Sequence, residues 1–515
     1  MIGASPTALF PLSDPTAAKI ATEIPPAYGV STANRPWVFA AALVTVFMAA
    51  IEGTIVATAV PSIVGSLGGF DLFSWLFTSY LLTQAITVPI YGRLADLYGR
   101  KRLLFLGIFL FLVGSILCGF APSMMTLIAF RVLQGMGAGA VMTVSQTLLG
   151  DIYRGADRAR MQGYISSVFA SAAILGPVVG AFIVAHWTWP MVFWVNVPLG
   201  LASAAMLALT LRERVERRRH RIDYVGSTLM ALGTGVLMFA LVQAATLSRG
   251  TMAALIVLSL VLIVWFFVHE ARVREPLLPL PLLRDPIIAF GNISSLTSGA
   301  AMMGIIAFLP AYMQGVMGES VLAAGYALMA LSGGWPVGGF AASRISIAFS
   351  YRAAVIAGGI VIILGSAMMV MLDPSRGATW AIVGTLLTGF GMGLTNNTFG
   401  VAIQANVEWT QRGIATSMTV FTRIIGQSLG TAVYAGILNA SLARHMTGGG
   451  DLVNRLMEPA LRAGIPAQEL MPLMAAFGEG LHNVYLLNFA LALIIMAVAL
   501  GMPKGLTPQG SSARS

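Results

Sequence analysis

The chain has 515 residues, of which 57% are hydrophobic and 10% charged, and its mean hydropathy is +0.83. This balance excludes an ordinary soluble domain and indicates a polytopic membrane protein. The net charge of +10 comes from short basic clusters between apolar segments, a pattern that orients helices in a bilayer. We therefore expect a lipid bilayer, and no nucleic acid, as the partner of the chain.

Residues 1–35 are rich in Pro, Ala, Ser and Thr, and they lack the basic start and short apolar core of a cleavable signal. We expect them to form a disordered cytoplasmic tail. Beyond them, the requirement of roughly 20 mostly apolar residues for each span predicts about fourteen transmembrane helices. The predicted spans are 37–62, 73–92, 103–121, 124–148, 162–185, 192–211, 223–245, 252–269, 287–313, 321–342, 353–372, 378–400, 413–441 and 482–502.

The loops between these spans alternate in charge. Basic residues gather in every second loop, as at 100–102 and 212–221, whereas the opposite loops hold few, such as Arg249. The positive-inside rule then predicts a multi-pass protein of the cell (inner) membrane with both termini in the cytoplasm. The long 442–481 loop is expected on the periplasmic side, and residues 504–515 are expected to form a second cytoplasmic tail.

The chain repeats two glycine motifs in the same order. Residues 135–139 (GMGAG) correspond to 389–393 (GFGMG), and 176–180 (GPVVG) correspond to 426–430 (GQSLG). Close helix packing is one explanation, because small residues four apart let helices approach each other. The matched order also indicates two related halves, as in many transporters.

This repeat predicts an all-α membrane protein of six plus two plus six helices. Six-helix bundles are expected at 36–211 and 286–503, and two inserted helices with basic cytoplasmic loops at 212–285. The halves differ in charge, since Thr385 stands where the first half has Arg131. We therefore expect the second half to have lost its charges, with proton coupling concentrated in the first.

A single carboxylate, Glu52, lies inside the first span. An ionised side chain at membrane depth is costly, and such residues usually face a cavity or a partner. We interpret Glu52 as the proton carrier of an exporter. At about 1.5 Å per residue, Glu52 and Arg131 lie about 15 Å and about 10 Å below the outer helix ends, so the two can meet. A permanent structural ion pair is the alternative to proton carriage, and a pair that breaks in one conformation satisfies both.

The loop after the second span combines an acid with several basic residues and two glycines. Asp96 among basic residues can make charge-assisted contacts that open and close as the halves move. A basic turn that only sets topology is the alternative. The predicted gating residues are Gly92, Arg93, Asp96, Gly99, Arg100 and Lys101.

At these residues the sequence resembles the major facilitator superfamily, whose signature between spans two and three is G-x-L-a-D-r-x-G-r-k. The match departs at Leu97, where a basic residue is common, and Arg131 followed by Gln134 agrees with the same family in the fourth span. The motif that the family associates with antiporters is matched in the fifth span by Gly176, Pro177 and Gly180.

The span count and the first span resemble the fourteen-span drug:proton antiporter branch. That branch has L-D-x-T-I-V-x-x-A-x-P, and residues 51–61 (IEGTIVATAVP) match it with Glu52 in place of aspartate. Ala181 and Pro190 depart from the branch pattern in the fifth and sixth spans. The resemblance implies multidrug efflux: the export of small amphipathic, often cationic compounds, which contributes to antibiotic resistance. We expect the exporter to be monomeric. Protons moving inward drive the export, so no cofactor is expected besides the proton gradient.

Polar and aromatic side chains in otherwise apolar spans are the candidates for substrate contacts. Each is explained equally well as a contact between helices. The candidates are Tyr80, Gln84, Asn292, Trp335, Asn396 and Asn397.

An exporter of an endogenous lipid, siderophore or metabolite is the main alternative function, and a non-transporting membrane sensor is a third. An enzyme is not expected, because the five histidines lie at helix ends or in loops and form no metal-ligand pattern. The chain also lacks a GxxxxGK[ST] phosphate loop, which argues against direct coupling to ATP.

Overall fold

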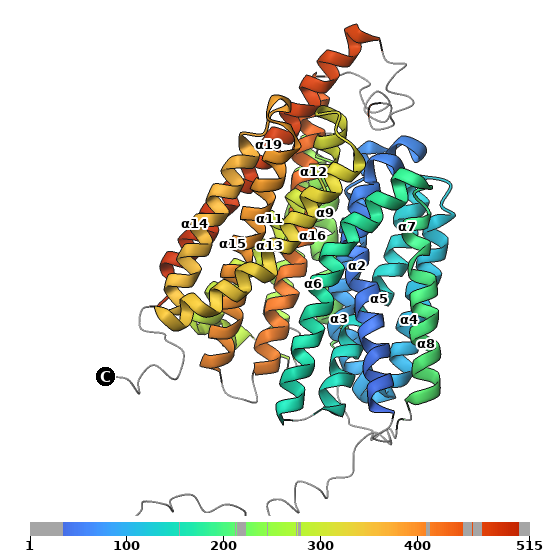
Figure 1. Cartoon of the computed structure of the whole chain (residues 1–515), viewed down its shortest axis with the longest axis vertical. Helices are drawn as coiled ribbons and strands as arrows, with labels where there is room; N and C mark the ends of the chain where they lie inside the picture. The colour runs from blue at the N-terminus through green and yellow to red at the C-terminus, as the bar shows by residue number, and fades with distance from the viewer. Residues whose placement is uncertain are drawn as a thin grey trace, which may run out of the picture.

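The computed structural model describes residues 34–153, 155–211, 213, 223–244, 246–273, 276, 280–407, 412–445, 456 and 466–503. In these ranges the chain forms long helices that run side by side (Figure 1). Both expected tails, 1–33 and 504–515, lie outside the described residues, as do the basic residues between 214 and 222.

Fourteen membrane-length helices follow one another along the described chain. They are α2 (Arg35–Leu67), α3 (Trp75–Tyr98), α4 (Arg100–Gly119), α5 (Met124–Ile152), α6 (Gly155–His186), α7 with α8 (Met191–Trp194 and Asn196–Thr210), α9 (Tyr224–Val242), α10 (Arg249–Glu270), α11 (Pro286–Ile306), α13 (Val321–Ala348), α14 (Tyr351–Val370), α15 (Gly377–Asn406), α16 (Arg412–His445) and α19 (Ala467–Gly501). The shorter helices are η1 (Phe70–Leu72), η2 (Leu280–Arg284), α12 (Leu309–Ala311), η3 (Tyr312–Val316) and η4 (Pro374–Arg376). The predicted all-α fold is confirmed.

Twelve of these spans are long and apolar enough to cross a membrane by length and composition. The other two, α3 and α16, contact each other where the halves of the protein meet. Polar side chains on both, such as Gln84 and Ser428, are buried within the protein. Helices that face protein on several sides need less apolar surface than helices that face lipid.

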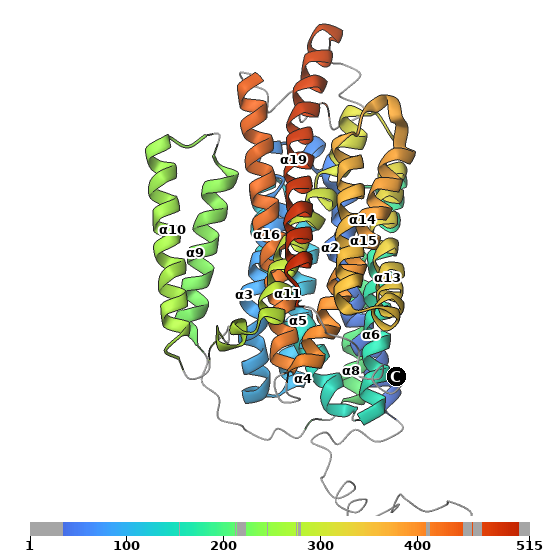
Figure 2. The same cartoon turned by 90° about the vertical axis from the view of Figure 1, so that its left-hand side faces the viewer.

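The two six-helix bundles repeat the same packing. In the first, α2 packs on α6 and α8, and α5 packs on α3 and α4. In the second, α11 packs on α16 and α19, and α15 packs on α13 and α14. The bundles meet through α6 with α13 and α3 with α16, and the inserted pair α9 and α10 stands outside them, with α9 against α3 and α16 (Figure 2).

The repeated glycines lie where helices touch. A Cβ atom added at Gly389 would lie 1.9 Å from the carbonyl oxygen of Leu331, and one added at Gly135 would lie 2.5 Å from that of Tyr80. These two contacts join α15 to α13 and α5 to α3, which are corresponding pairs in the two halves. Close packing is therefore sufficient to explain small residues at these positions.

The two ends of the bundle differ in charge. Exposed Arg102, Arg272 and Arg344 lie where α4 begins and where α10 and α13 end, which we call the basic end. Exposed Arg249 and Arg376 lie at the opposite end. This distribution agrees with the alternation of charge between loops.

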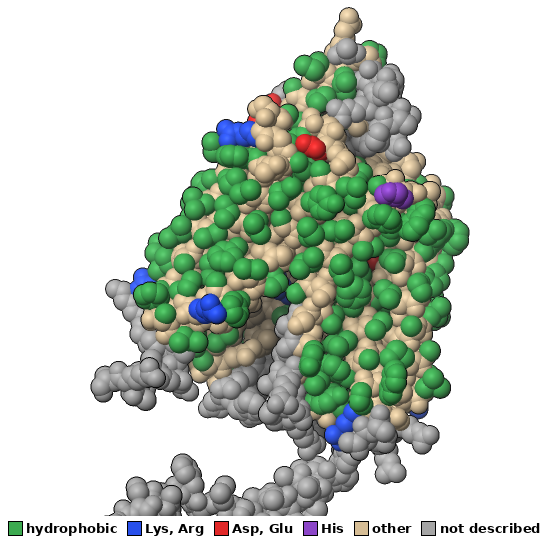
Figure 3. Space-filling view, viewed as in Figure 1, with side chains coloured by type: hydrophobic (Ala, Val, Ile, Leu, Met, Phe, Trp, Pro, Cys, Tyr) green, Lys and Arg blue, Asp and Glu red, His purple; other side chains and the backbone are tan. Residues whose placement is uncertain are grey.

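Aromatic rings close the end opposite the basic end. Phe73 of the first half lies 5.3 Å from Phe308 of the second, and Phe70 lies 5.4 Å from Phe477, between ring centroids. We call this the aromatic end. Toward the basic end the space-filling view shows a hollow between the two halves (Figure 3). The structure is therefore open at one end and closed at the other.

The last helix begins earlier than the sequence suggested. It starts at Ala467 rather than at 482, and α16 continues to His445, so the expected 442–481 loop was assigned too long. The hydropathy criterion failed here because it detects only the bilayer-length apolar part of a helix, whereas backbone hydrogen bonds carry α19 beyond it. Residues 446–455 and 457–465 lie outside the described residues.

We expect Gly389→Ala to lower the free energy of unfolding by about 1–3 kcal/mol, because the added methyl group meets a backbone oxygen rather than a flexible side chain. Gly333→Ala on α13 is the matched control, since a Cβ there meets nothing within 4 Å. Alanine in a helix interior is favoured over glycine by up to about 1 kcal/mol, so this control should be neutral or stabilising. Thermal unfolding of the purified protein in detergent measures both, and equal Tm values would contradict the close contact of α13 and α15.

Candidate functional site

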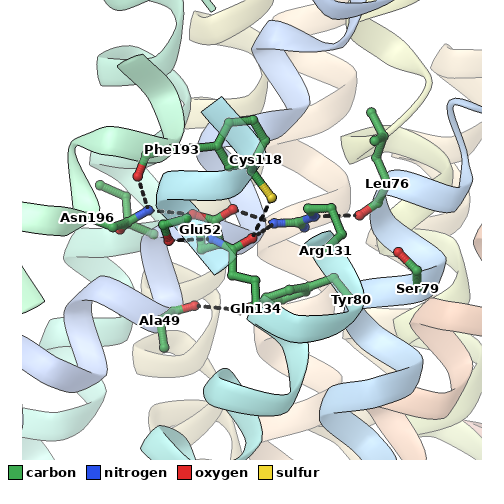
Figure 4. Close-up of polar contacts among 12 residues, drawn as sticks. Ala49, Glu52, Leu76, Ser79, Tyr80, Cys118, Arg131, Gln134, Phe193 and Asn196 are labelled. Atoms are coloured by element: carbon green, nitrogen blue, oxygen red, sulfur yellow. Dashed lines mark hydrogen bonds and ion pairs between the residues drawn. The ribbon is translucent and has the colours of Figure 1, made fainter. Parts of the chain in front are cut away.

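A buried ion pair lies at the centre of the first half. Arg131 of α5 contacts a carboxylate oxygen of Glu52 on α2 through Nη1, and the two side chains are 1% and 0% exposed (Figure 4). Removing either partner would leave an uncompensated charge in a low-dielectric interior, which is strongly unfavourable. The pairing is thus the condition under which both groups can be buried there.

The carboxylate has a second partner. Asn196, at the start of α8, donates from Nδ2 to the other oxygen of Glu52 over 2.6 Å. The carbonyl oxygen Oδ1 of the same amide is buried and has no hydrogen-bond partner among the described residues. Glu52 is therefore held from two helices, and the Asn196 amide retains one acceptor.

The guanidinium is held by three acceptors. Besides Glu52, Nη1 of Arg131 donates to Oε1 of Gln134 over 2.6 Å, and Nε donates to the backbone oxygen of Leu76 on α3 over 2.8 Å. Gln134 in turn donates to Ser115 of α4 over 2.8 Å. The network therefore joins α2, α3, α4, α5 and α8, which means most of the first half.

Two aromatic rings enclose the pair. The Cζ atom of Arg131 lies 4.2 Å from the centroid of the Tyr80 ring and 5.8 Å from that of Phe193. Both rings can stabilise the cation through their faces. They also separate the ion pair from solvent, since Tyr80 is 2% and Phe193 0% exposed.

The sequence placed Glu52 and Arg131 at depths where the two can meet and left open whether they pair, and the structure brings them together. The sequence did not assign a role to Gln134, which lies in the family pattern of the fourth span, or to Asn196. Their signal was an amide side chain in an otherwise apolar span, the same signal that selected Gln84 and Asn292. Sequence alone does not distinguish amides that face a charge from amides that join two helices.

The predicted gating loop is a sharp break between α3 and α4. Gly99 has a φ of 93°, a backbone conformation that side chains rarely allow. Glu213, which the sequence did not single out, accepts from the backbone nitrogens of Arg100 and Lys101 over 2.7 and 2.8 Å. This carboxylate satisfies the first amides of α4 and ties the loop to the segment after α8. The side chains of Arg93 and Asp96 lie outside the described residues.

The antiporter-associated motif packs α6 against two neighbours. Cβ atoms at Gly176 and Gly180 would lie 2.0 and 2.4 Å from the hydroxyl oxygens of Thr54 and Thr58 on α2. A Cβ at Gly325 of α13 would lie 3.0 Å from the carbonyl oxygen of Pro177. The motif thus lies between the helix that carries Glu52 and the second half.

A cavity of about 160 Å³ lies in the second half, between α11, α13, α15 and α16. Three of the predicted substrate contacts, Trp335, Asn396 and Asn397, line it. Asn292 does not, and it instead accepts a hydrogen bond from Thr422 over 2.9 Å, joining α11 to α16. The cavity is further lined by Ser295, Gly400, Ile403, Thr416, Thr419, Val420 and Arg423.

Arg423 corrects an expectation. The sequence suggested that the second half had lost its charges, yet this arginine of α16 lines the cavity. The expectation came from aligning the glycine motifs of the two halves, which considered only the position equivalent to Arg131. Scanning each span for any charge, the signal that identified Glu52, would have found Arg423 inside the predicted span 413–441.

The described residues offer no metal site: no group of three or more His, Cys, Asp or Glu side chains among them can hold an ion. What the first half offers instead is one carboxylate whose charge depends on whether it holds a proton, bonded to one guanidinium whose charge is fixed.

Comparison with known proteins assigns the family. Residues 42–431 match the family model of the Major Facilitator Superfamily. The chain belongs to the major facilitator superfamily. It is 30% identical over 483 residues to Multidrug resistance protein 3 of Bacillus subtilis (strain 168), which covers 90% of this chain and 94% of that protein. It is 32% identical over 429 residues to Multidrug transporter protein MdtP of the same strain, covering 83% and 78% of the two chains.

Solved structures share the fold. A bacterial homologue of the human lysosomal transporter Spinster gives a TM-score of 0.66 at 17% identity, covering 91% of this chain and 97% of that one. The nucleoside transporter NupG gives 0.60 at 10% identity, with coverage of 91% and 100%. As a member of the superfamily, this protein is a multi-pass membrane transporter for small molecules and not an enzyme.

A double-mutant cycle tests the ion pair. We expect Arg131→Met to cost about 3–5 kcal/mol of stability, because it leaves the Glu52 carboxylate buried without its counter-ion. Combining it with Glu52→Gln should cost less than the sum of the single changes, by about 1–3 kcal/mol. Thermal unfolding in detergent gives the four values. The control is Arg344→Met, at an exposed arginine of α13, which should change stability by less than about 0.5 kcal/mol. Strictly additive effects of Arg131→Met and Glu52→Gln would show that the ion pair contributes nothing to stability.

Proposed function

We propose that this transporter is a proton-coupled antiporter that exports small amphipathic compounds, as in the fourteen-span drug:proton branch of the superfamily. The observation that carries the proposal is the buried carboxylate of Glu52, bonded to Arg131 inside the first half. Two further points support it: the six plus two plus six arrangement, and relatives named for multidrug resistance and multidrug transport.

Glu52 is the proton carrier in this scheme. In the conformation described here it accepts from both Arg131 and Asn196, which is the role of an ionised carboxylate. Adding a proton removes the charge that holds the guanidinium, so that Arg131 loses its strongest acceptor and bonds more strongly to Gln134 and the Leu76 carbonyl. Proton binding and release therefore favour different arrangements of the same network.

The network reaches the contact between the halves. Arg131 donates to Leu76 near the start of α3, and two residues later the Thr78 carbonyl accepts from the Ser428 hydroxyl of α16 over 3.3 Å. A shift of α3 that follows protonation of Glu52 would change this contact. Such a contact, made in one state and altered in the other, is how a local charge change can bias the movement of two rigid halves.

Coupling in this scheme is indirect. Glu52 is 0% exposed, and the described cavity lies in the other half, so a substrate there does not touch the carboxylate. A substrate that competed directly with the proton would have to reach Glu52 itself. We propose instead that proton and substrate each bias the same conformational change, the proton from the first half and the substrate from the second. This requires only that each of them binds one conformation of the transporter more tightly than the other.

Two other functions remain as alternatives. Export of an endogenous lipid, siderophore or metabolite would use the same fold and the same carboxylate, and it differs only in the compound moved. A non-transporting sensor has no need of a protonatable group, so its activity would survive Glu52→Gln.

Proton flux in everted membrane vesicles tests the coupling. Adding a compound from a panel of amphipathic cations and anions, including ethidium and tetraphenylphosphonium, should release protons from the acidified lumen when the wild-type protein is present. Glu52→Gln should reduce this release to the level of membranes without the protein, because the amide cannot carry a proton. Asp71→Asn, the same change at an exposed carboxyl group, should not. Equal release by Glu52→Gln and wild type would exclude Glu52 as the carrier, and no release with any compound would favour the endogenous exporter.

Orientation in the cell membrane is tested by cysteine labelling. We propose that the basic end, where the described chain begins and ends, faces the cytoplasm. The one cysteine, Cys118, is buried, so Cys118→Ser gives a background without reactive thiols. In that background Ser375→Cys at the aromatic end should react with an impermeant maleimide in intact cells, whereas Ala271→Cys at the basic end should react only after permeabilisation. The reverse pattern would invert the topology.

A further inference from the structure

The cavity of the second half carries a positive charge, and the ion pair of the first half does not neutralise it. Glu52 and Arg131 neutralise each other within their own network. Arg423 lines the cavity and is partly accessible from it. No described residue forms an ion pair or hydrogen bond with its guanidinium. An unpaired cation within a membrane-spanning helix is costly, and such groups mark sites that bind a charged ligand or ion.

The backbone holds Arg423 in place. A Cβ atom added at Gly299 of α11 would lie 2.3 Å from the Arg423 carbonyl oxygen, and one added at Gly426 would lie 2.1 Å from the carbonyl of Leu296. The backbones of α11 and α16 therefore touch on either side of this residue. The backbone of Arg423 is therefore fixed beside the cavity that its side chain lines.

The rest of the lining suits an amphipathic molecule. Trp335 offers a large aromatic surface, and Ile403 and Val420 offer apolar ones. Ser295 and Thr419 add hydroxyl groups within the same lining. One fixed positive charge among apolar walls and a few polar groups is the arrangement of a small-molecule site that orients its ligand by one charged group.

We propose that the compounds exported by this protein are amphipathic organic anions, in which a carboxylate, sulfonate or phosphate bonds to Arg423 and an aromatic or aliphatic body packs on Trp335. This inference rests on the proposed export function and specifies its substrate class. The sequence resemblance favoured cations. A cation in this cavity would meet the charge of Arg423, which has no partner among the described residues, while the Glu52 carboxylate is fully buried in the other half and already paired.

The sign of the substrate changes how export is driven. An anion that leaves removes negative charge from the cell, and a proton that enters adds positive charge. The exchange therefore moves net positive charge inward, so the membrane potential and the proton gradient act in the same direction. An exchange of one proton for a monovalent cation would be electrically neutral. Arg423 is fixed in charge at every physiological pH, so the anion site itself needs no proton.

Equilibrium binding to the purified full-length protein in detergent tests the site without any gradient. Three probes share one naphthyl body and differ in charge: 1-naphthaleneacetate, the neutral 1-naphthaleneacetamide and the 1-naphthylmethylammonium cation. We expect the wild type to bind the acetate at least about tenfold more tightly than the amide, since a charge-assisted bond to a guanidinium is stronger than a neutral one. The ammonium should bind more weakly than the amide.

Variants assign this preference to Arg423. Arg423→Gln should lose the preference for acetate over amide, and Arg423→Lys should keep part of it. Binding of the amide acts as an internal measure of an intact cavity in each variant. The matched control is Arg344→Gln, because Arg344 is exposed on α13 and stacks on Phe340, 4.6 Å from its ring centroid, outside the cavity lining.

Several results would overturn the proposal. They are equal or tighter binding of the amide or the ammonium by the wild type, and an unchanged preference for acetate in Arg423→Gln. If Arg423→Gln does not fold, the proposal is still tested by the order of affinity of the wild type for the three probes and by the preference of Arg423→Lys for acetate over amide.

The outcome is separable from that of the proton-coupling proposal. Glu52→Gln should keep the preference for acetate over amide, because Arg423 lies in the other half, whereas the shared conformational change alters the affinity for both probes together. Proton flux that persists in Glu52→Gln would refute the coupling role of Glu52 and leave the anion site standing. A wild type that prefers the ammonium would refute the anion site and leave the proton-coupled export of cations standing.

Discussion

The bond between Arg131 and Glu52 is the interaction on which the first half depends. Neither group can be left alone in a low-dielectric interior, so helices α2 and α5 are fixed to each other at this depth. The remaining donors and acceptors of the pair then recruit α3, α4 and α8 through Leu76, Gln134 and Asn196. A group of helices held through one carboxylate is stable, and it is also sensitive to whether that carboxylate holds a proton. That combination suits a coupling element.

Direct contact between helix backbones is the second constraint. At Gly135 and Gly389 corresponding helix pairs of the two halves approach so closely that a methyl group would not fit. Such contacts make each half a rigid body, because packed backbones do not deform gradually. Motion is then confined to the surface between the halves, where α3 meets α16 and α6 meets α13. At the aromatic end that surface is closed by rings, and toward the basic end it opens (Figure 3).

The halves share a fold but divide the chemistry. The first encloses the Glu52–Arg131 pair completely, whereas the second presents Arg423 to a cavity. A proton can cross to a buried carboxylate without a wide opening, but an amphipathic molecule needs an accessible volume with surfaces to pack on. Placing the two sites in separate rigid bodies allows each ligand to act on the same movement without direct contact.

Local sequence determined the helices, their number and the distribution of basic residues, because the apolarity of a span and the charge of a loop are properties of neighbouring residues. It also selected Glu52, since a carboxylate in an apolar span is conspicuous by itself. Only the tertiary structure decided that Glu52 bonds to Arg131, 79 residues away in the chain, and that Asn196 completes the site. Only the packing of the helices showed that Trp335 lines the cavity whereas Asn292 joins two helices. It also showed that Arg423 has no partner among the described residues. Which polar groups meet depends on how helices pack across the bundle, and no window along the chain contains that information.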